Sequence, residues 1–261
     1  MKTLFLAWQA THPGAGAASR AWYPIGKLDY LADKGVHRFS YTCGVERASA
    51  EAGFKPLDAF PRVDDVYESR ELFSLFSNRL VSPRRRDYAE FLERLALDPQ
   101  HADPLDVLAI SEGRRQTDNL EVFPRIEPST DGSFRCRFFL HGWRYVNSHA
   151  QERIGELSHG DALGVALELN NPATGVAIQL QDGRDYLMLG WAPRYLVNDL
   201  LRAMSDAPSQ IRARVVRLNP EPAPHNQRLL VELEGRFPES YHPMTSREFQ
   251  PISQCPPGGA H

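Results

Sequence analysis

Residues 163–180 read LGVALELNNPATGVAIQL, which is two strand-like runs on either side of an Asn-Asn-Pro corner. Asn, Pro, Thr and Gly between apolar runs of period two predict a β-hairpin. Glu168 is the one charged residue in the stretch. Antiparallel hairpins that face water usually carry more polar residues. We therefore expect this corner to have a role for which few charged side chains are needed.

The segments around this hairpin also have the pattern of β-strands. Apolar residues alternate along 134–140, and branched or aromatic residues recur in 186–191, 211–218 and 228–235. A helix is expected after Pro193, with a buried stripe formed by Leu196, Val197, Leu200, Leu201 and Met204. Many short strands with one or two helices predict a small β-barrel.

The first half of the chain mixes strands and helices. Strands are expected at 3–8, 22–31, 37–42 and 119–126. A helix is predicted within 68–81, where one face carries Leu72, Phe73, Phe76 and Leu80. Two more helices are predicted where an N-cap residue precedes proline, at Ser82-Pro83 and Asp103-Pro104. The first has an apolar stripe of Tyr88, Phe91, Leu92 and Leu95, and the second ends at Gly113.

A cluster of Pro, Ser, Thr, Asp and Gly at 124–133 separates the two halves. We therefore expect an α+β chain, mainly β, in two domains. Residues 1–126 form a small α+β domain, 127–133 a linker, and 134–250 a β-barrel. Residues 251–261, which end in PPGGAH, are expected to be a flexible tail.

The composition is that of a globular protein of 261 residues, 42% hydrophobic and 24% charged. The formal net charge of -3 excludes a global basic field of the kind that attracts nucleic acids. Residues 131–261 contain 13 arginines and no lysine. Arginine suits bidentate phosphate contacts, although genomic base composition also explains a chain with only four lysines. Any nucleic acid must therefore bind a local patch, and modestly.

The opening residues MKTLFLAWQATHPG contain an apolar run too short for a signal peptide, and no later run approaches the length of a membrane span. Cys43, Cys136 and Cys255 are odd in number and widely spaced, so no disulfide framework is expected. A reducing cytoplasm fits this pattern.

Three segments of the second half, in order, are FFLHGWRYV (138–146), LSHGDALGVALELNNPATGVAIQL (157–180) and LGWAPRYLVNDL (189–200). Together they make residues 134–237 resemble the HIRAN domain family. The resemblance implies a partly open, OB-like barrel that binds DNA, as in the members that hold a single-stranded 3′ end. The corner would then form one wall of a groove, where bases stack and few charges are needed.

Matched residue by residue, the resemblance implies nucleic-acid contacts by Arg144, Tyr145, Asn171, Ala173, Thr174, Trp191 and Arg194. Tyr and Trp rings can stack on unpaired bases, which is worth roughly 1–3 kcal/mol per base. Arginine can hold phosphates in a fork geometry. The members that bind 3′ ends have Tyr and Asp where this chain has Ala173 and Thr174. Ala cannot stack and Thr is a weaker acceptor, so the contacts that read a 3′ terminus are missing.

Each of these residues also has a purely structural interpretation. Trp191 can cap the core, Tyr145 can pack across strands, and Arg144 can make only a cation–π contact. Arg194 stands at a helix start, where the dipole repels cations. Either an external anion or a nearby acidic side chain would compensate.

Residues 4–126 carry a second resemblance, in the order WYPIGKLDYLADKGVHRFSYT (22–42), YESRELFSLFSNRL (67–80), SPRRRDYAEFLERLAL (82–97) and DPLDVLAISEGRRQTDNLEVFP (103–124). This half is similar to the N-terminal subdomain of HipA-type kinases, also found alone as the HipS protein of toxin–antitoxin operons. No Gly-rich phosphate loop or catalytic Asp segment is present, so the kinase body is missing. The resemblance implies a module that acts on a separate protein.

Arg84, Arg85 and Arg86 fall in the first turn of a predicted helix, where cations are mildly unfavourable. They could contact DNA phosphates or an acidic partner surface. A solvated helix start is the commoner meaning of such a run, with the compensating charges supplied here by Asp87, Glu90 and Glu93.

No pattern of catalytic or metal-binding residues is complete. Cys136, His141, His149 and His159 lack the second Cys pair of a zinc site. Alternation places Cys136 on the inward face, where a small apolar thiol suffices. The chain has no Walker motif and no nucleophile elbow, so we expect no enzyme activity, no metal and no cofactor.

The sequence therefore predicts a cytoplasmic, non-catalytic DNA-binding accessory protein. It would hold single-stranded DNA or DNA ends in a genome-defence, repair or toxin–antitoxin setting. Expected partners are DNA and a kinase, helicase or helix-turn-helix protein encoded nearby, with no membrane. One alternative is an antitoxin-like subunit that acts on a kinase without binding DNA. The other is a metal-dependent hydrolase, which no motif supports.

Overall fold

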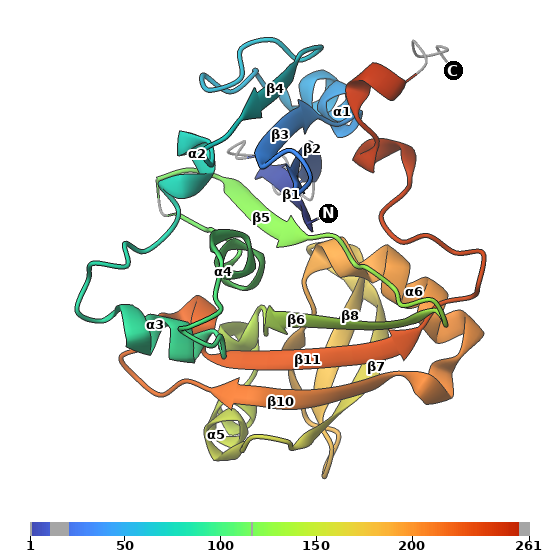
Figure 1. Cartoon of the computed structure of the whole chain (residues 1–261). Coiled ribbons are helices and arrows are strands. Elements are labelled where there is room, and N and C mark those ends of the chain that lie inside the picture. The colour runs from blue at the N-terminus through green and yellow to red at the C-terminus, as the bar shows by residue number, and fades with distance from the viewer. Residues whose placement is uncertain (1, 11–20, 116, 256–261) are drawn as a thin grey trace. The chain divides into compact units, whose positions relative to one another are not determined.

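The computed structural model describes residues 2–10, 21–115 and 117–255 (Figure 1). The chain forms two compact units. The first comprises Met1–Arg85, Asp103–Arg125 and Met244–His261, and the second comprises Arg86–Ala102 and Ile126–Pro243. The break after Arg125 lies within a residue of the expected domain end at 126. Residues 86–102 group with the second unit and 244–255 with the first, whereas 1–126 had been expected to form one domain, 134–250 another and 251–261 a flexible tail.

The first unit is built on an antiparallel sheet in the order β4-β3-β2-β1-β5. Its strands are β1 (Lys2–Gln9), β2 (Trp22–Leu31), β3 (Val36–Tyr41), β4 (Val66–Ser69) and β5 (Leu120–Pro124). The four strands predicted in this half are confirmed, and β4 is additional. Alternate residues such as Ile25 and Phe39 point into the core. Burial raises the pKa of Tyr41 to about 12, and its neutral hydroxyl donates to the Phe60 carbonyl at 2.8 Å.

Three helices belong to this unit: α1 (Gly44–Ala52), α2 (Ser74–Ser77) and α4 (Pro104–Ser111). The prediction of α4 is confirmed, since Asp103 caps it by accepting from the backbone N–H groups of Leu105 and Asp106. The long helix expected within 68–81 is wrong. Only one turn forms there, because β4 takes Ser69 and the residue at the N-cap, Phe73, has no side-chain acceptor.

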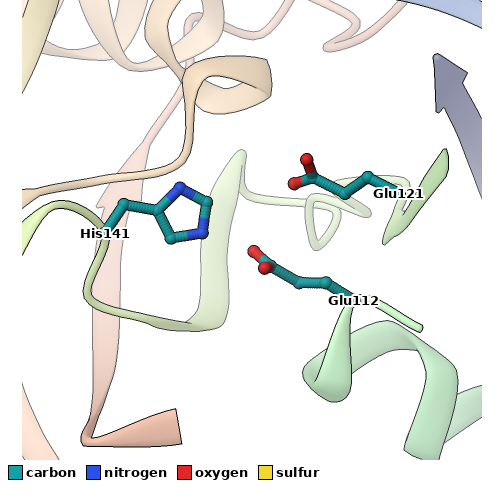
Figure 2. A group of neighbouring side chains, drawn as sticks. All are labelled: Glu112, Glu121 and His141. Carbon is teal, nitrogen blue, oxygen red and sulfur yellow. The ribbon is translucent and has the colours of Figure 1, made fainter. Parts of the chain in front are cut away.

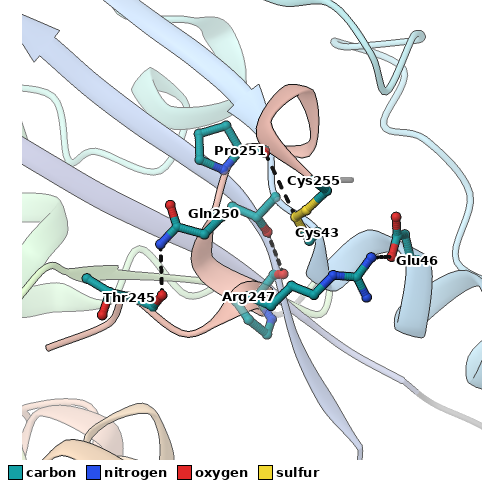
Figure 3. Close-up of a disulfide and its surroundings, with 9 residues drawn as sticks. Cys43, Glu46, Thr245, Arg247, Gln250, Pro251 and Cys255 are labelled. Carbon is teal, nitrogen blue, oxygen red and sulfur yellow. Dashed lines mark hydrogen bonds and ion pairs between the residues drawn. A yellow bond between two sulfur atoms is a disulfide. The ribbon is translucent and has the colours of Figure 1, made fainter. Parts of the chain in front are cut away.

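Residues 244–255 fold back onto α1 and β2 and contain two short 3-10 turns, η6 (Arg247–Phe249) and η7 (Ile252–Gln254) (Figure 3). The backbone N–H of Cys43 donates to the Gln250 carbonyl at 2.9 Å, and Arg247 pairs with Glu46 at 2.8 Å. Cys43 and Cys255 form a disulfide with their Cα atoms 6.4 Å apart. The expectation of no disulfide is therefore wrong for these two residues. A contact across 212 residues leaves no signal in the spacing.

Reduction of the Cys43–Cys255 disulfide should destabilise the first unit. Such cross-links typically contribute about 2–4 kcal/mol, mainly by restricting the unfolded chain. We therefore expect a reductant to lower its melting temperature by about 5–10 °C in a thermal scan. A Cys43→Ser variant should melt at the lower temperature with or without reductant. A wild-type melt that does not respond to reductant would contradict the prediction.

The second unit contains a six-stranded antiparallel sheet in the order β6-β11-β10-β7-β8-β9. Its strands are β6 (Ser133–Phe139), β7 (Ala162–Asn171), β8 (Gly175–Asp182), β9 (Met188–Trp191), β10 (Arg212–Leu218) and β11 (Leu229–Arg236). Every strand predicted in this half is confirmed, including the hairpin β7–β8. His141, two residues beyond β6, exchanges two backbone hydrogen bonds of 2.9 Å with Trp191 of β9. The fold is mixed α+β and mainly β, and no closed barrel is found in the described chain.

Three helices pack in the second unit: α3 (Tyr88–Arg94), α5 (Ser148–Glu156) and α6 (Val197–Asp206). Three 3-10 turns, η2 (Trp143–Tyr145), η4 (Pro208–Gln210) and η5 (His225–Gln227), occupy its loops. The predicted α6 is confirmed; it follows the turn η3 (Arg194–Leu196), while α5 was not predicted. The carbonyl of Arg94 accepts from the Asn219 side chain at 3.1 Å, which ties α3 to the end of β10. This contact explains why residues 86–102 group with the second unit.

One carboxylate on the outer face of this sheet is covered by the side chains of neighbouring arginines. Glu232 of β11 is 1% exposed and pairs in register with Arg137 on β6 and Arg214 on β10. Arg137 Nε donates to it at 2.7 Å and Arg214 Nε at 3.1 Å. Burial by itself raises the pKa of Glu232. The hydrogen bonds from the two arginines and the charges of Arg137 and Arg135 outweigh burial and hold the pKa below its ordinary value.

A Glu232→Gln substitution should destabilise the protein by about 1–3 kcal/mol at pH 7, because the negative charge is lost and one of the two acceptor oxygens becomes an NH2 donor that faces an arginine. The folded-state pKa is lowered, so the stability that Glu232 supplies is present above the ordinary pKa of 4.5 and is lost as pH falls below it. The difference between wild type and variant in urea unfolding should therefore shrink below about pH 4.5. The control is Glu234→Gln, a half-exposed neighbour, which should cost less than about 1 kcal/mol.

No helix in the described ranges has both the length and the apolar character that crossing a bilayer requires.

Candidate nucleic-acid interface

The corner between β7 and β8 is shaped by one asparagine. The Asn171 side-chain oxygen accepts from the backbone N–H of Ala173 at 2.9 Å and of Thr174 at 3.1 Å. It also accepts from the Thr174 hydroxyl at 3.1 Å. This is the Asx-turn arrangement, in which a side chain replaces a backbone turn. Ala173 and Thr174 are exposed at the tip, but the polar groups of Asn171 and Thr174 are engaged within the corner.

Glu168 is the one charged residue of 163–180, and it joins the corner to β9. Its carboxylate accepts from the Trp191 indole N–H at 2.6 Å and from the Asn171 amide at 3.0 Å. Burial raises the pKa of Glu168, but hydrogen bonds from Asn171, Trp191 and Gln179 hold it below the ordinary value. The group is therefore a carboxylate at neutral pH. Glu168 is therefore a structural anchor between the corner and β9.

Trp191 is half-buried at the end of β9, where it supports the loop that follows β6. Gly142 has a φ of 70°, and a Cβ placed there would lie 2.4 Å from the Trp191 ring. Only glycine allows this conformation and this close approach together. The loop therefore lies directly against the indole, and part of the ring is covered by backbone.

Arg144 and Tyr145 stand on the 3-10 turn η2, which is fixed at both ends. The Trp143 indole N–H donates to the His225 carbonyl at 2.7 Å, and the Gln151 side-chain amide donates to the Val146 carbonyl, directly after the turn, at 3.0 Å. Tyr145 itself is 77% exposed. The guanidinium of Arg144 lies 6.0 Å from the centre of the Tyr145 ring, at the outer limit of a cation–π contact. A large aromatic ring is thus displayed to solvent on a well-anchored turn.

The predicted residues are brought together to different degrees. Hydrogen bonds link Thr174, Asn171 and Trp191 through Glu168, and Gly142 connects Trp191 to the turn that carries Arg144 and Tyr145. Arg194 is half-buried at the start of η3, three residues beyond Trp191. Sequence reasoning missed Glu168 and Gly142 as members of this group. The isolation of Glu168 in an apolar stretch was the available signal.

The run Arg84–Arg86 is not in a helix. Helix α3 begins at Tyr88, with Asp87 at its N-cap, so the three arginines lie in the exposed turn where the chain passes from the first unit to the second. The prediction of a helical first turn there is wrong. Pro83 does not start a helix: the residues from Pro83 to Asp87 form turns, and the helix begins at Tyr88.

Other reactive groups are held in neutral or paired states. Glu112 and Glu121 of the first unit are both paired with Arg114 at 3.0 Å. Figure 2 draws these two carboxylates together with His141. His141 belongs to the second unit, so no metal site is assigned to the three. Burial, with the nearby charge of Glu232, raises the pKa of Cys136 to about 12, and this thiol contacts the Leu233 carbonyl at 3.5 Å. The thiol is therefore inert at neutral pH.

No family model matches this chain, and no curated protein or solved structure is significantly similar to it.

An Asn171→Ala substitution should loosen the corner without unfolding the sheet. The backbone N–H groups of Ala173 and Thr174 would lose their acceptor, so their amide hydrogens should exchange faster, by about fivefold or more for a loss of about 1 kcal/mol. Hydrogen exchange read by NMR measures this directly. The amides of the buried β8 residues Ile178 and Leu180 serve as the internal reference and should be unchanged.

Proposed function

We propose that the second unit is a non-catalytic module that binds single-stranded DNA or exposed DNA ends. The observation that carries this proposal is Tyr145, an aromatic ring 77% exposed on a turn held by hydrogen bonds and by the Trp191 ring. An unpaired base gains stacking energy on such a ring, and the ring loses little freedom on binding because its turn is already ordered. Arg144 lies beside it and can hold the adjoining phosphate.

The sheet order is compatible with the OB-like barrel that the HIRAN resemblance implies. The edge strands β6 and β9 approach each other at the bridge between His141 and Trp191. In this proposal the bridge marks the partly open seam of the barrel, and the stacking residues flank it. Binding modules of this kind often use the exposed face of a small β-barrel.

Glu168 favours bases over phosphates at the Trp191 end of the site. A carboxylate hydrogen-bonded to the indole repels phosphate groups, whereas the flat face of a base carries no charge. The proposal therefore places bases at Tyr145 and Trp191. A duplex, whose bases are already stacked, offers this arrangement only at its ends.

A role without DNA is the second candidate, and the corner favours it. The polar groups of Asn171 and Thr174 are used within the corner, and Ala173 offers no ring. In that case the first unit, which resembles the HipA N-terminal subdomain, would act on a kinase partner. DNA binding by the isolated chain separates the two functions.

A Tyr145→Ala substitution should weaken binding of a fluorescein-labelled single-stranded oligonucleotide by about 5- to 100-fold, as expected when one stacked base loses roughly 1–3 kcal/mol. Fluorescence anisotropy at low salt measures this. Tyr145→Phe keeps the ring and should bind within about twofold of wild type.

The matched control is Tyr186→Ala. Tyr186 is 72% exposed in the same unit, on the turn between β8 and β9. Its loss should leave binding unchanged. Equal binding by Tyr145→Ala and wild type would reject the stacking site, and no binding by wild type at low salt would favour the protein-interaction role.

A further inference from the structure

Four arginines surround two glutamates on the outer face of the second sheet. The register pairs Arg135 on β6 and Arg212 on β10 with Glu234 between them on β11. One rung further along, Arg137 and Arg214 flank Glu232 in the same way. Side chains at these paired positions lie on one side of the sheet. We call these six residues the arginine face.

The arginine face keeps an excess of positive charge. Four guanidinium groups against two carboxylates leave a formal charge of about +2. Glu232 is buried under Arg137 and Arg214, whereas the side chains of Arg135 and Arg214 are 59% and 53% exposed. Each guanidinium has five N–H donors, more than two carboxylates can use. Donors on this face therefore remain available to an anion.

Two of the four arginines make no short hydrogen bond to Glu232. Arg135 lies at the longer distances of 3.5 Å from Glu232 and 3.4 Å from Glu234. Arg212 donates to the Ser209 backbone carbonyl at 2.8 Å. These two residues can be changed while the short contacts of Arg137 and Arg214 to Glu232 stay in place. The binding capacity of the face can thus be tested without orphaning the buried carboxylate.

The arginine face is continuous with the side of the sheet that carries Trp191. Arg214 pairs with Ala162 on β7, and two and four residues along, Gly164 and Ala166 pair with Gln181 and Gln179 on β8. Gln179 in turn pairs with Trp191 on β9. Because paired residues share a side and alternate residues along a strand do too, these positions form one outer face.

The path from Arg214 to Trp191 is short, and its β7 positions carry only small side chains. It crosses three strand spacings and four residues of strand, which gives roughly 20 Å. The β7 residues along it are Ala162, Gly164 and Ala166. Glu168 lies beyond Trp191, toward the corner. A charged polymer held at Trp191 is therefore repelled at the corner end and attracted toward the arginines.

The chemistry of the arginine face selects phosphates. No exposed aromatic ring belongs to its two rungs, so it can hold charge but cannot stack bases. Arginine forks match phosphate oxygens bidentately. We propose that the arginine face binds the phosphate backbone of the same DNA strand whose bases stack at Tyr145 and Trp191, so that the bound strand runs across Gly164 and Ala166. This inference rests on the proposed function.

The test compares two labelled thymidine oligonucleotides, about 3 and about 15 nucleotides long. The shorter one occupies the stacking site, and the longer one also spans roughly 20 Å to the arginines. In an Arg135→Gln/Arg212→Gln variant, the long oligonucleotide should bind about fivefold or more weakly than to wild type. The short one should bind within about twofold. The slope of log affinity against log salt for the long oligonucleotide should fall by about 1.4, since each lost phosphate contact removes about 0.7.

The matched charge control is Arg115→Gln/Arg202→Gln. Both arginines are exposed and neither lies on this face. It should leave the length dependence of binding unchanged. A second pair of variants tests the path itself. A Cβ at Gly164 would lie 3.4 Å from the Gln181 Cβ, an ordinary contact, so a side chain fits there. Gly164→Glu should weaken binding of the long oligonucleotide, and Gly164→Gln should not.

The outcomes distinguish this inference from the proposed function. If Tyr145→Ala weakens both oligonucleotides but Arg135→Gln/Arg212→Gln changes neither, the stacking site stands and the arginine face is rejected. If the arginine variant weakens both lengths equally, the arginines act as a general attraction and the path is rejected. If only the arginine variant has an effect, the phosphate site stands and the stacking site fails. If wild type binds neither oligonucleotide, both fail.

Discussion

Trp191 makes three contacts on which the candidate interface depends. Its backbone pairs with His141, its ring supports Gly142, and its indole N–H donates to Glu168. These contacts hold the turn after β6 and the hairpin corner against the edge strand β9. A half-buried indole with all of these partners is a structural residue first. The more exposed of the two rings proposed to stack on bases is Tyr145, which the anchored turn displays to solvent.

Charge is distributed unevenly over the outer face of the second sheet. The carboxylate of Glu168 stands near the corner, small residues follow along β7, and the arginine face lies on the far side. Glu232 organises that face, because its burial requires the short contacts from Arg137 and Arg214. Stability and binding capacity are therefore assigned to different arginines. This separation allows the charge of the surface to be altered while the fold is kept.

The first unit is closed by a segment distant in the chain. Phe249 packs against Phe5 at 4.9 Å between ring centres, and the backbone N–H of Cys43 donates to the Gln250 carbonyl beside the Cys43–Cys255 disulfide. The disulfide thus reinforces contacts that apolar packing and hydrogen bonds already make. It fixes the return of the chain to the unit in which it began, and the kinase-partner role proposed for this unit would use a surface stabilised in that way.

The sequence by itself determined the strands of both sheets except β4, and the helices α4 and α6. Period-two alternation and the Asp103 cap are local signals that no distant contact overrides. Tertiary structure decided what local signals cannot carry. The disulfide joins residues 212 apart, α2 is a single turn, and α3 begins after the arginine run instead of within it. The role of Glu168 and the alignment of four arginines around Glu232 follow from strand register, which pairs residues that the sequence keeps far apart.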